Sequence, residues 1–198
     1  MNHDKLEAMA TGQTKIDPEL EKAQTGYQAL LDGFQSIQLG TVSAEGSPEA
    51  SYSPAIVDEA RHFYVHVSEL AAHTANLMET GKASVLVIED ESAADIIFAR
   101  KRVTFTCEAQ RIERHSGEWE SVIARFEEKF GKMMGFLKTM EDFHLFRLEP
   151  SYARLVLGFG KAYDVTGPDM NEIEHVNGKN GAHRKEGHQT ESEEEAKG

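Results

Sequence analysis

The sequence contains very little cysteine, proline or tryptophan, and it has no long apolar run. Of 198 residues, one is cysteine, five are proline and one is tryptophan. A single Cys107 excludes a disulfide framework within one chain. Its place in the alternating segment 103–109 predicts a packed strand residue rather than a metal ligand. No apolar stretch approaches the ~18 residues that a membrane-spanning helix requires, so we expect no membrane insertion.

Positive charge is also in the minority. Lysine and arginine number 21, against 34 aspartate and glutamate residues, and the formal net charge is −13. This balance disfavours general binding to nucleic acid or to anionic lipid. The N-terminus lacks the basic, apolar and small-residue order of a secretory signal, so the expected location is the cytoplasm. The length suits one domain with a sizeable core.

Helical and strand patterns alternate through the first half of the chain. After a flexible arm over residues 1–17, a helix is predicted for 18–33, because an Asp-Pro pair opens it and apolar residues recur at helical spacing. From 34 to 67 the apolar period becomes two, which predicts three strands of a meander. Segment 70–78 returns to helical spacing, and Gly81 stands where a C-cap glycine belongs.

The second half contains further strands and one strong helical stripe. The near-continuous apolar run 83–90 predicts a strand buried on both faces, and the alternation in 103–112 predicts another. Apolar residues over 119–130 recur at i, i+3, i+4, i+7 and i+11, which predicts an amphipathic helix. Segments 143–148 and 152–159 are the last two predicted strands.

The order of these elements indicates the fold class. About seven strands and three or four helices are predicted, and tight turns join most successive strands. This favours a mainly β fold, an antiparallel barrel with flanking helices, over a doubly wound parallel sheet. The expected domain spans 18–168. A polar segment over 169–189 follows, and the composition of 190–198 predicts a disordered tail.

The densest basic run in this acidic chain is Arg100-Lys101-Arg102, at the start of a predicted strand. On a strand, Arg100 and Arg102 point to one face and Lys101 to the other. An arginine side chain is a planar fork that matches a carboxylate or phosphate group. The run is therefore compatible with a carboxylate site, with a flavin phosphate site or with a solvated strand end.

Histidines gather near the C-terminus. His183 is followed by Arg184 and Lys185, with His175 and His188 on either side. A neutral imidazole is the usual axial donor to haem iron in proteins that handle oxygen. The same composition fits a solvated end or an incidental metal-binding tail.

Other candidate positions are weaker. Gly158 and Gly160 flank Phe159, so the backbone there can approach a flat ligand closely, although glycines at strand ends are common. Asp142 precedes a strand, where acidic residues usually cap or solvate a turn. His73 is expected to be half exposed unless it contacts a ligand. The histidines expected to be structural are His62, His66, His115 and His144.

Several segments together resemble a known family. Segments 34–57, 66–77 and 98–102 are similar to the split-barrel flavin-binding group typified by pyridoxamine-phosphate oxidases. Within that group the chain resembles the HugZ and HutZ type of haem-degrading proteins. The matching segments are 88–91, 98–102, 142–148, 158–163 and 183–185. The resemblance covers roughly residues 30 to 185.

This resemblance implies a homodimeric, six- to seven-stranded antiparallel split β-barrel that binds haem at the dimer interface. The segment 169–189 would be the ligand-binding loop, with His183 as the axial ligand of the haem iron. Asp142 would hydrogen-bond that histidine across the dimer, and Arg102 would bind a propionate. Further haem contacts are expected from Arg100, Lys101, His73, Gly158, Phe159, Gly160, Arg184 and Lys185.

The implied activity is that of a haem oxygenase. Family members oxidise haem to a biliverdin and release iron, using oxygen and an external electron donor. Two alternatives stay open. One is an FMN-binding split-barrel oxidoreductase, in which Lys101, Arg102, Ser68 and His73 would hold the flavin phosphate. The other is a haem carrier or storage protein without turnover.

Overall fold

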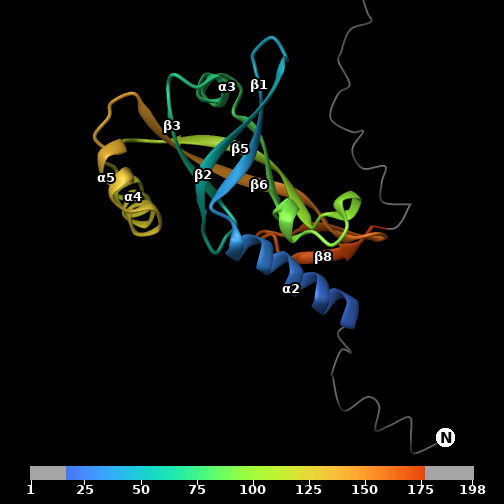
Figure 1. Cartoon of the computed structure of the whole chain (residues 1–198). Coiled ribbons are helices and arrows are strands. Elements are labelled where there is room, and N and C mark those ends of the chain that lie inside the picture. The colour runs from blue at the N-terminus through green and yellow to red at the C-terminus, as the bar shows by residue number, and fades with distance from the viewer. Residues whose placement is uncertain (1–16, 177–198) are drawn as a thin grey trace, which may run out of the picture.

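A computed structural model describes residues 17–176. In this part of the chain, eight strands form one sheet, accompanied by four α-helices and two short 3₁₀ turns (Figure 1). In chain order the elements are α2 (Pro18–Gly33), β1 (Ser36–Val42), β2 (Pro48–Val57), β3 (Phe63–Ser68), α3 (Ala72–Thr80), β4 (Lys82–Ile88), η1 (Glu91–Ala93), η2 (Ile97–Ala99), β5 (Arg102–Ile112), α4 (Gly117–Phe130), α5 (Lys132–Leu137), β6 (Phe143–Gly158), β7 (Lys161–Thr166) and β8 (Glu172–His175).

Six of the strands close into a barrel. They follow one another in the order β3-β2-β1-β4-β5-β6, and the pairing of β3 with β6 joins the last strand to the first. All strand pairs are antiparallel, and β7 and β8 continue the sheet from β6. The predicted mainly β fold, an antiparallel barrel with flanking helices, is thus confirmed.

Alternation places every second side chain of the strands inside the barrel. Val85, Phe105 and Cys107 are buried there, and burial raises the pKa of the Cys107 thiol to about 12, which confirms a packed residue. The Phe105 ring meets Phe63 edge-on at 4.8 Å and lies 6.2 Å from the Tyr27 ring of α2. Such pairs add about 0.5–1.5 kcal/mol beyond burial. Helix α2 therefore closes one end of the barrel.

Two predicted helix ends are confirmed. The Asp17 side chain accepts a hydrogen bond from the Glu19 N–H at 2.9 Å, and Pro18 is the first residue of α2. Gly81 ends α3 with φ of +62°, a conformation that costs glycine little.

Helices α4 and α5 cover the outer face of the barrel at the end away from α2 (Figure 1). The predicted stripe on α4 is confirmed, since Trp119, Val122, Ile123 and Phe126 form a second core with barrel residues. No helix within residues 17–176 is both long and apolar enough to cross a bilayer.

Part of the strand prediction is wrong. The two strands predicted for 143–148 and 152–159 are one strand, β6, which continues through Pro150. A register shift at Thr106 and Cys107 of β5 places Pro150 at a bulge, where proline is tolerated. Strands β7 and β8 lie where no strand was predicted, and β8 extends the sheet beyond Pro168.

Candidate functional site

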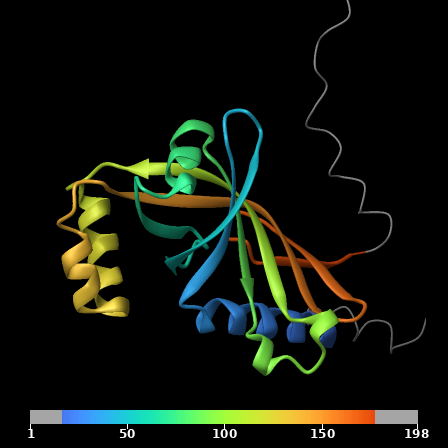
Figure 2. The ribbon, with the colours of Figure 1, turned by 45° about the horizontal axis from the view of Figure 1, so that its top comes forward.

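The structure distributes the described candidate residues over two ends of the barrel. Figure 2 shows β6 running from the helices α4 and α5 to the hairpin that leads into β7. Near its last residues lie Arg100, Lys101 and Arg102, since Arg102 pairs with Val156. We call this the arginine end. Near its first residue lie Asp142 and Ser68, since Ser68 pairs with Phe143. We call this the aspartate end.

The three basic residues of the arginine end differ in their partners. The Arg100 guanidinium donates to the Glu89 carbonyl and to the Glu91 carboxylate, at 2.9 Å for the carboxylate. The Lys101 Nζ lies 3.6 Å from a Glu89 carboxylate oxygen. Arg100 and Lys101 thus already have acidic partners, which leaves them less able to bind an anionic ligand.

Arg102 is the cation with spare donors. Within residues 17–176, the one hydrogen bond of its side chain runs from Nη1 to the Arg100 carbonyl at 2.9 Å. Strand pairing places it on the outer barrel face between Ile88 of β4 and Val156 of β6. We predicted that Arg100 and Arg102 share one face of a strand, and this is wrong because the strand begins only at Arg102. The Arg100 side chain instead folds back onto the β4–β5 loop.

Exposed apolar side chains lie at the same end of the barrel as Arg102. Phe98 is 86% exposed and Phe159 is 69% exposed, and Ile96 and Ile97 are about half exposed. The turn η2 contacts β6, so these side chains lie at the same end of the sheet. Large apolar groups rarely gather on a surface without a partner. Together with Arg102, they suit a ligand that is apolar in its body and anionic at its rim.

The glycines at this end form a tight hairpin. Gly158 pairs with Lys161, so Phe159 and Gly160 are the two loop residues between β6 and β7. Gly160 has φ of +68°, and a Cβ built there would meet no atom within 4 Å. The positive φ that this turn requires explains why residue 160 is glycine. The open space beside it leaves room for a ligand to approach the backbone.

At the aspartate end, the Ser68 hydroxyl donates to Asp142 Oδ2 at 2.7 Å. The Glu69 N–H donates to the Asp142 carbonyl at 2.9 Å. Because Ser68 contacts Asp142, its hydroxyl is not beside Lys101 and Arg102. A single chain therefore does not assemble the flavin-phosphate set of Ser68, Lys101 and Arg102.

Two further histidines lie near Asp142. His144 shares a 2.6 Å hydrogen bond with the Glu69 carboxylate. His66 is only 8% exposed, and neither of its ring nitrogens has a partner among the described residues. Burial, helped by the charges of Arg114 and His144 and opposed by Asp142, lowers the pKa of His66 to about 4. This burial agrees with the expectation that His66 is a structural residue.

His73 is buried rather than half exposed. It is 8% exposed, and its Nδ1 lies 2.9 Å from the Ser51 hydroxyl of β2. Burial lowers its pKa. On the same helix, the Asn76 amide donates to Thr41 at 2.9 Å and to Glu49 at 3.2 Å. These contacts fix α3 against strands β1 and β2, which is sufficient to explain why His73 is there.

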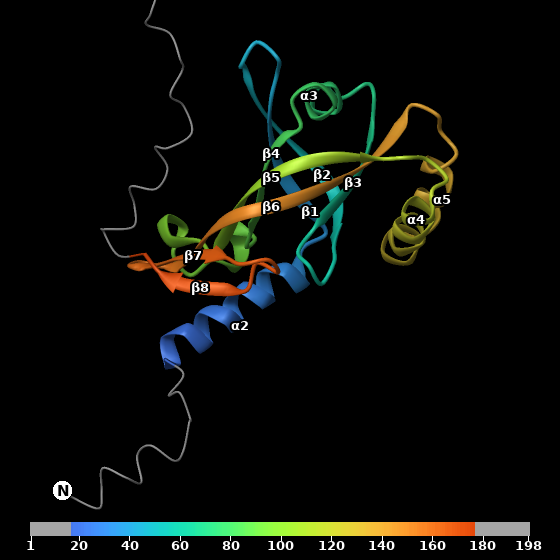
Figure 3. The same cartoon turned by 180° about the vertical axis from the view of Figure 1, so that it is seen from behind.

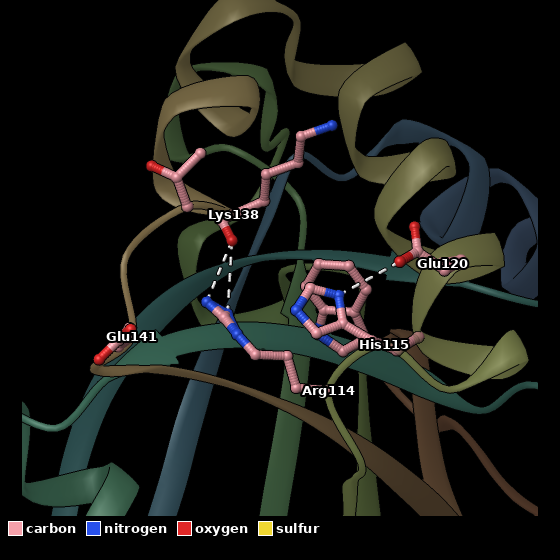
Figure 4. A pocket seen from close by; sticks show the side chains of 7 residues that line it. Arg114, His115, Glu120, Lys138 and Glu141 are labelled. Atoms are coloured by element: carbon pink, nitrogen blue, oxygen red, sulfur yellow. Dashed lines mark hydrogen bonds and ion pairs between the residues drawn. The ribbon is translucent and has the colours of Figure 1, made fainter.

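One pocket of the described chain contains none of the predicted site residues. Its volume is about 570 Å³, and it lies between the end of β5 and the turn that follows α5 (Figure 4). The Arg114 guanidinium points across it to the Lys138 carbonyl, and His115 faces Glu120. The lining residues are Arg114, His115, Trp119, Glu120, Lys138, Thr139 and Glu141.

The predicted ligand histidines are placed only in part. His183, His188, Arg184 and Lys185 lie outside the described residues. His175 is on β8, where its ring meets the Tyr163 ring edge-on at 4.9 Å.

Sequence comparison identifies relatives over most of the chain. The model of the pyridoxamine 5′-phosphate oxidase family matches residues 24–157. Over 164 residues the chain is 38% identical to heme oxygenase HutZ of Vibrio cholerae serotype O1, covering 83% of this chain and 89% of that protein.

Solved structures agree with this match. HutZ from Vibrio cholerae, described there as a heme storage protein, superposes with a TM-score of 0.62 at 35% identity, covering 72% of this chain and 96% of that one. ChuZ of Campylobacter jejuni superposes with a TM-score of 0.71 at 28% identity, covering 80% and 64%. The chain therefore belongs to the pyridoxamine 5′-phosphate oxidase family and, within it, to the HutZ-type haem-degrading proteins.

Proposed function

We propose that this protein binds haem and degrades it by a haem oxygenase reaction, opening the macrocycle to a biliverdin and releasing iron. The close relative named heme oxygenase HutZ supports the reaction class. The observation that carries the binding step is the arginine end. There, Arg102 has side-chain donors without a partner among the described residues, and the exposed rings of Phe98 and Phe159 lie at the same end of the barrel. Haem presents an apolar ring and two carboxylates, which match these two kinds of group.

We further propose that the complete site requires two copies of the chain. Asp142 and Arg102 lie near opposite ends of β6. At the usual rise of a strand, the 13 residue steps from Phe143 to Val156 span roughly 40 Å. One haem cannot reach both ends of one barrel. In a homodimer, Arg102 of one subunit and Asp142 of the partner subunit would meet at a shared ligand.

We place this pairing on the outer face of the barrel. The outer faces of β4, β5 and β6 carry half-buried residues, among them Leu86, Thr104 and Val156. Helices α4 and α5 lie at the other end of the strands (Figure 3). A partly apolar sheet face of this kind suits contact with a second copy.

Each residue then has a chemical role. His183 would supply the axial imidazole, and the carboxylate of Asp142 would accept the hydrogen bond from the other ring nitrogen, fixing the tautomer and the ring orientation. Arg102 would hold a propionate and so set the orientation of the macrocycle. Bound haem supplies the iron at which oxygen is activated, and an external donor supplies electrons. The proposed compartment is the cytoplasm.

Hemin titration tests this proposal. The purified protein is expected to give a Soret band that saturates at one hemin per site and shifts in His183→Ala. Ascorbate with oxygen should then bleach the band and yield a biliverdin. An unchanged spectrum in His183→Ala would remove His183 from the ligand role, with His175 and His188 as the next variants.

The same titration separates the alternative functions. Saturable binding of FMN without binding of hemin would favour a flavin-dependent oxidoreductase. Bound haem that survives reductant and oxygen would favour storage, the role stated for the HutZ crystal structure.

A further inference from the structure

We propose that Ser68 and Arg114 are positioning residues that hold the Asp142 carboxylate in place for its partner. This inference rests on the proposed role of Asp142 at the haem site. It concerns how the fold fixes that residue, because the turn that carries Asp142 is tied to two other parts of the barrel.

The first tie is the side chain of Ser68, at the end of β3. Its hydroxyl accepts a hydrogen bond from the Leu70 N–H at 3.2 Å and lies 2.7 Å from Asp142 Oδ2. A serine hydroxyl carries one proton. An ionised carboxylate can only accept, so the hydroxyl proton is directed to Asp142, while a lone pair of the hydroxyl accepts the Leu70 N–H.

The second tie runs through the backbone beside it. The Glu69 N–H donates to the Asp142 carbonyl at 2.9 Å. Side chain and main chain of Asp142 are therefore bound to two adjacent residues, the last residue of β3 and the one after it. This leaves Oδ1 as the oxygen to which no described residue donates, and it is free to accept a hydrogen bond from a ligand-bound imidazole.

Arg114 supplies the third tie, from the turn after β5. Its two terminal nitrogens donate to the Lys138 carbonyl at 3.0 and 3.4 Å, and one of them also donates to the Met140 carbonyl. The guanidinium lies 5.5 Å from the centre of the Trp119 ring, so α4 holds it in place. Figure 4 shows this side chain crossing the pocket to reach the turn.

The three contacts come from two parts of the chain, the end of β3 and the turn after β5. Ser68 and Glu69 bind the residue itself, and Arg114 binds the two carbonyls just before it. Groups that orient a metal-bound imidazole must themselves be fixed to act, because a displacement of about 1 Å lengthens the hydrogen bond beyond its useful range. We infer that the geometry of Asp142 depends on Ser68 and Arg114 even though neither touches the ligand.

Hydrogen exchange without haem tests the restraint directly. In Arg114→Lys, a single ammonium replaces the forked guanidinium and cannot hold both carbonyls. The amides of the turn 139–143 are therefore expected to exchange about tenfold faster. The matched control is Arg125→Lys, since Arg125 also donates to a backbone carbonyl and lies over an aromatic ring. Equal protection of the turn in Arg114→Lys and wild type would overturn the role of Arg114.

Resonance Raman spectroscopy of the ferrous haem complex tests the consequence. Asp142→Asn is expected to lower the iron–histidine stretching frequency, and Ser68→Ala and Arg114→Lys should lower it in the same direction by a smaller shift. Ser68→Thr keeps the hydroxyl and should restore the wild-type frequency. Ser53→Ala is the control, because Ser53 is a buried serine whose hydroxyl donates to a backbone carbonyl elsewhere in the barrel.

The outcomes separate this inference from the proposed function. If Asp142→Asn shifts the band and Ser68→Ala does not, the role of Ser68 is overturned while that of Asp142 stands. If Asp142→Asn itself leaves the band unchanged, the role of Asp142 at the haem fails, and the positioning role fails with it. If hemin does not bind, the proposed function fails, and the exchange rates alone decide whether the turn is held as described.

Discussion

At the scale of single residues, Arg102 and Lys101 are neighbours with different surroundings. The Lys101 side chain is 51% exposed and lies near Glu89, whereas the Arg102 guanidinium keeps donors free on the outer barrel face. A free donor with a planar fork gains more from a propionate than an exposed ammonium that already has an acidic partner.

We therefore expect Arg102→Ala to weaken hemin binding by about 10–100-fold, the usual value of a charge-assisted hydrogen bond. Lys101→Ala should weaken it by no more than about threefold. Fluorescence-quenching titrations of both variants measure the difference. Equal losses in the two variants would mean that overall charge, rather than the fork of Arg102, holds the ligand.

His66 predicts a specific sensitivity to acid. Its pKa is about 4 in the folded protein and about 6.5 in an unfolded chain. Between pH 4 and 6.5 the unfolded chain protonates His66 while the folded protein does not. The free energy of unfolding therefore falls as the pH falls from 6.5 to 4 and is regained as the pH rises. The full difference corresponds to about 3 kcal/mol.

His66→Leu removes the titrating group and should flatten this part of the stability curve. Urea unfolding at pH 7 and pH 4.5 gives the measurement. His115→Asn is the control, since the His115 side chain is 71% exposed and asparagine tolerates its positive φ. A wild-type-like loss of stability in His66→Leu would show that another group causes the acid sensitivity.

At the scale of elements, the position of α4 depends on more than its apolar stripe. The Lys129 Nζ donates to the carbonyls of Phe34 and Ala55, at 2.9 and 3.1 Å, and lies 4.4 Å from the centre of the Phe34 ring. This one side chain joins α4 to the segment just before β1 and to the last residues of β2. Burial, with the charge of Arg125, lowers its pKa.

Lys129→Met keeps most of the apolar stem and removes the donors. We expect a loss of about 1 kcal/mol in the free energy of unfolding, because two carbonyls lose a partner while water can partly replace it. Chemical denaturation measures this value, with Lys132→Met on α5 as the control. No change beyond the control would mean that the stripe alone holds the helix.

Sequence patterns were sufficient for most helices and for the strands up to β6, but not for β7 and β8, which extend the sheet from the edge of β6. Gly81 and the stripe from Trp119 were predictable because local rules govern helix ends and helix faces. Strand β8 reads Glu-Ile-Glu-His, with Ile173 as its one apolar residue, and it exists because β7 offers an edge. The surroundings of His66 likewise come from residues remote in sequence, since the Phe143 ring lies 5.1 Å from its ring and the charge of Arg114 helps to lower its pKa.

The candidate site was predictable as a set of residues and not as an arrangement. Family resemblance selected Arg102 and Asp142, but only strand register reveals that they lie at opposite ends of β6. The role of Arg114 could not be read from the sequence, since an arginine after a strand is ordinary and its carbonyl partners are 24 and 26 residues away.

At the scale of the whole molecule, the proposed site predicts that dimerisation and haem binding are lost together. Leu86→Glu introduces a charge on the uncovered face of β4 and should give a monomer. Analytical ultracentrifugation with and without hemin measures both effects. Met133→Glu is the control, because Met133 is 66% exposed on α5, away from that face. A monomeric Leu86→Glu that still binds hemin with wild-type affinity would contradict a shared site.

The closure of the barrel by β3 and β6 also bears on how the chain folds during synthesis. Val65 and Phe146 are paired although about eighty residues separate them. Until β6 has left the ribosome, β3 and β5 are open edges with apolar neighbours, a state prone to association with other chains. Chains truncated before residue 143 should therefore aggregate, and the slowest folding phase should be the one in which β6 enters between them.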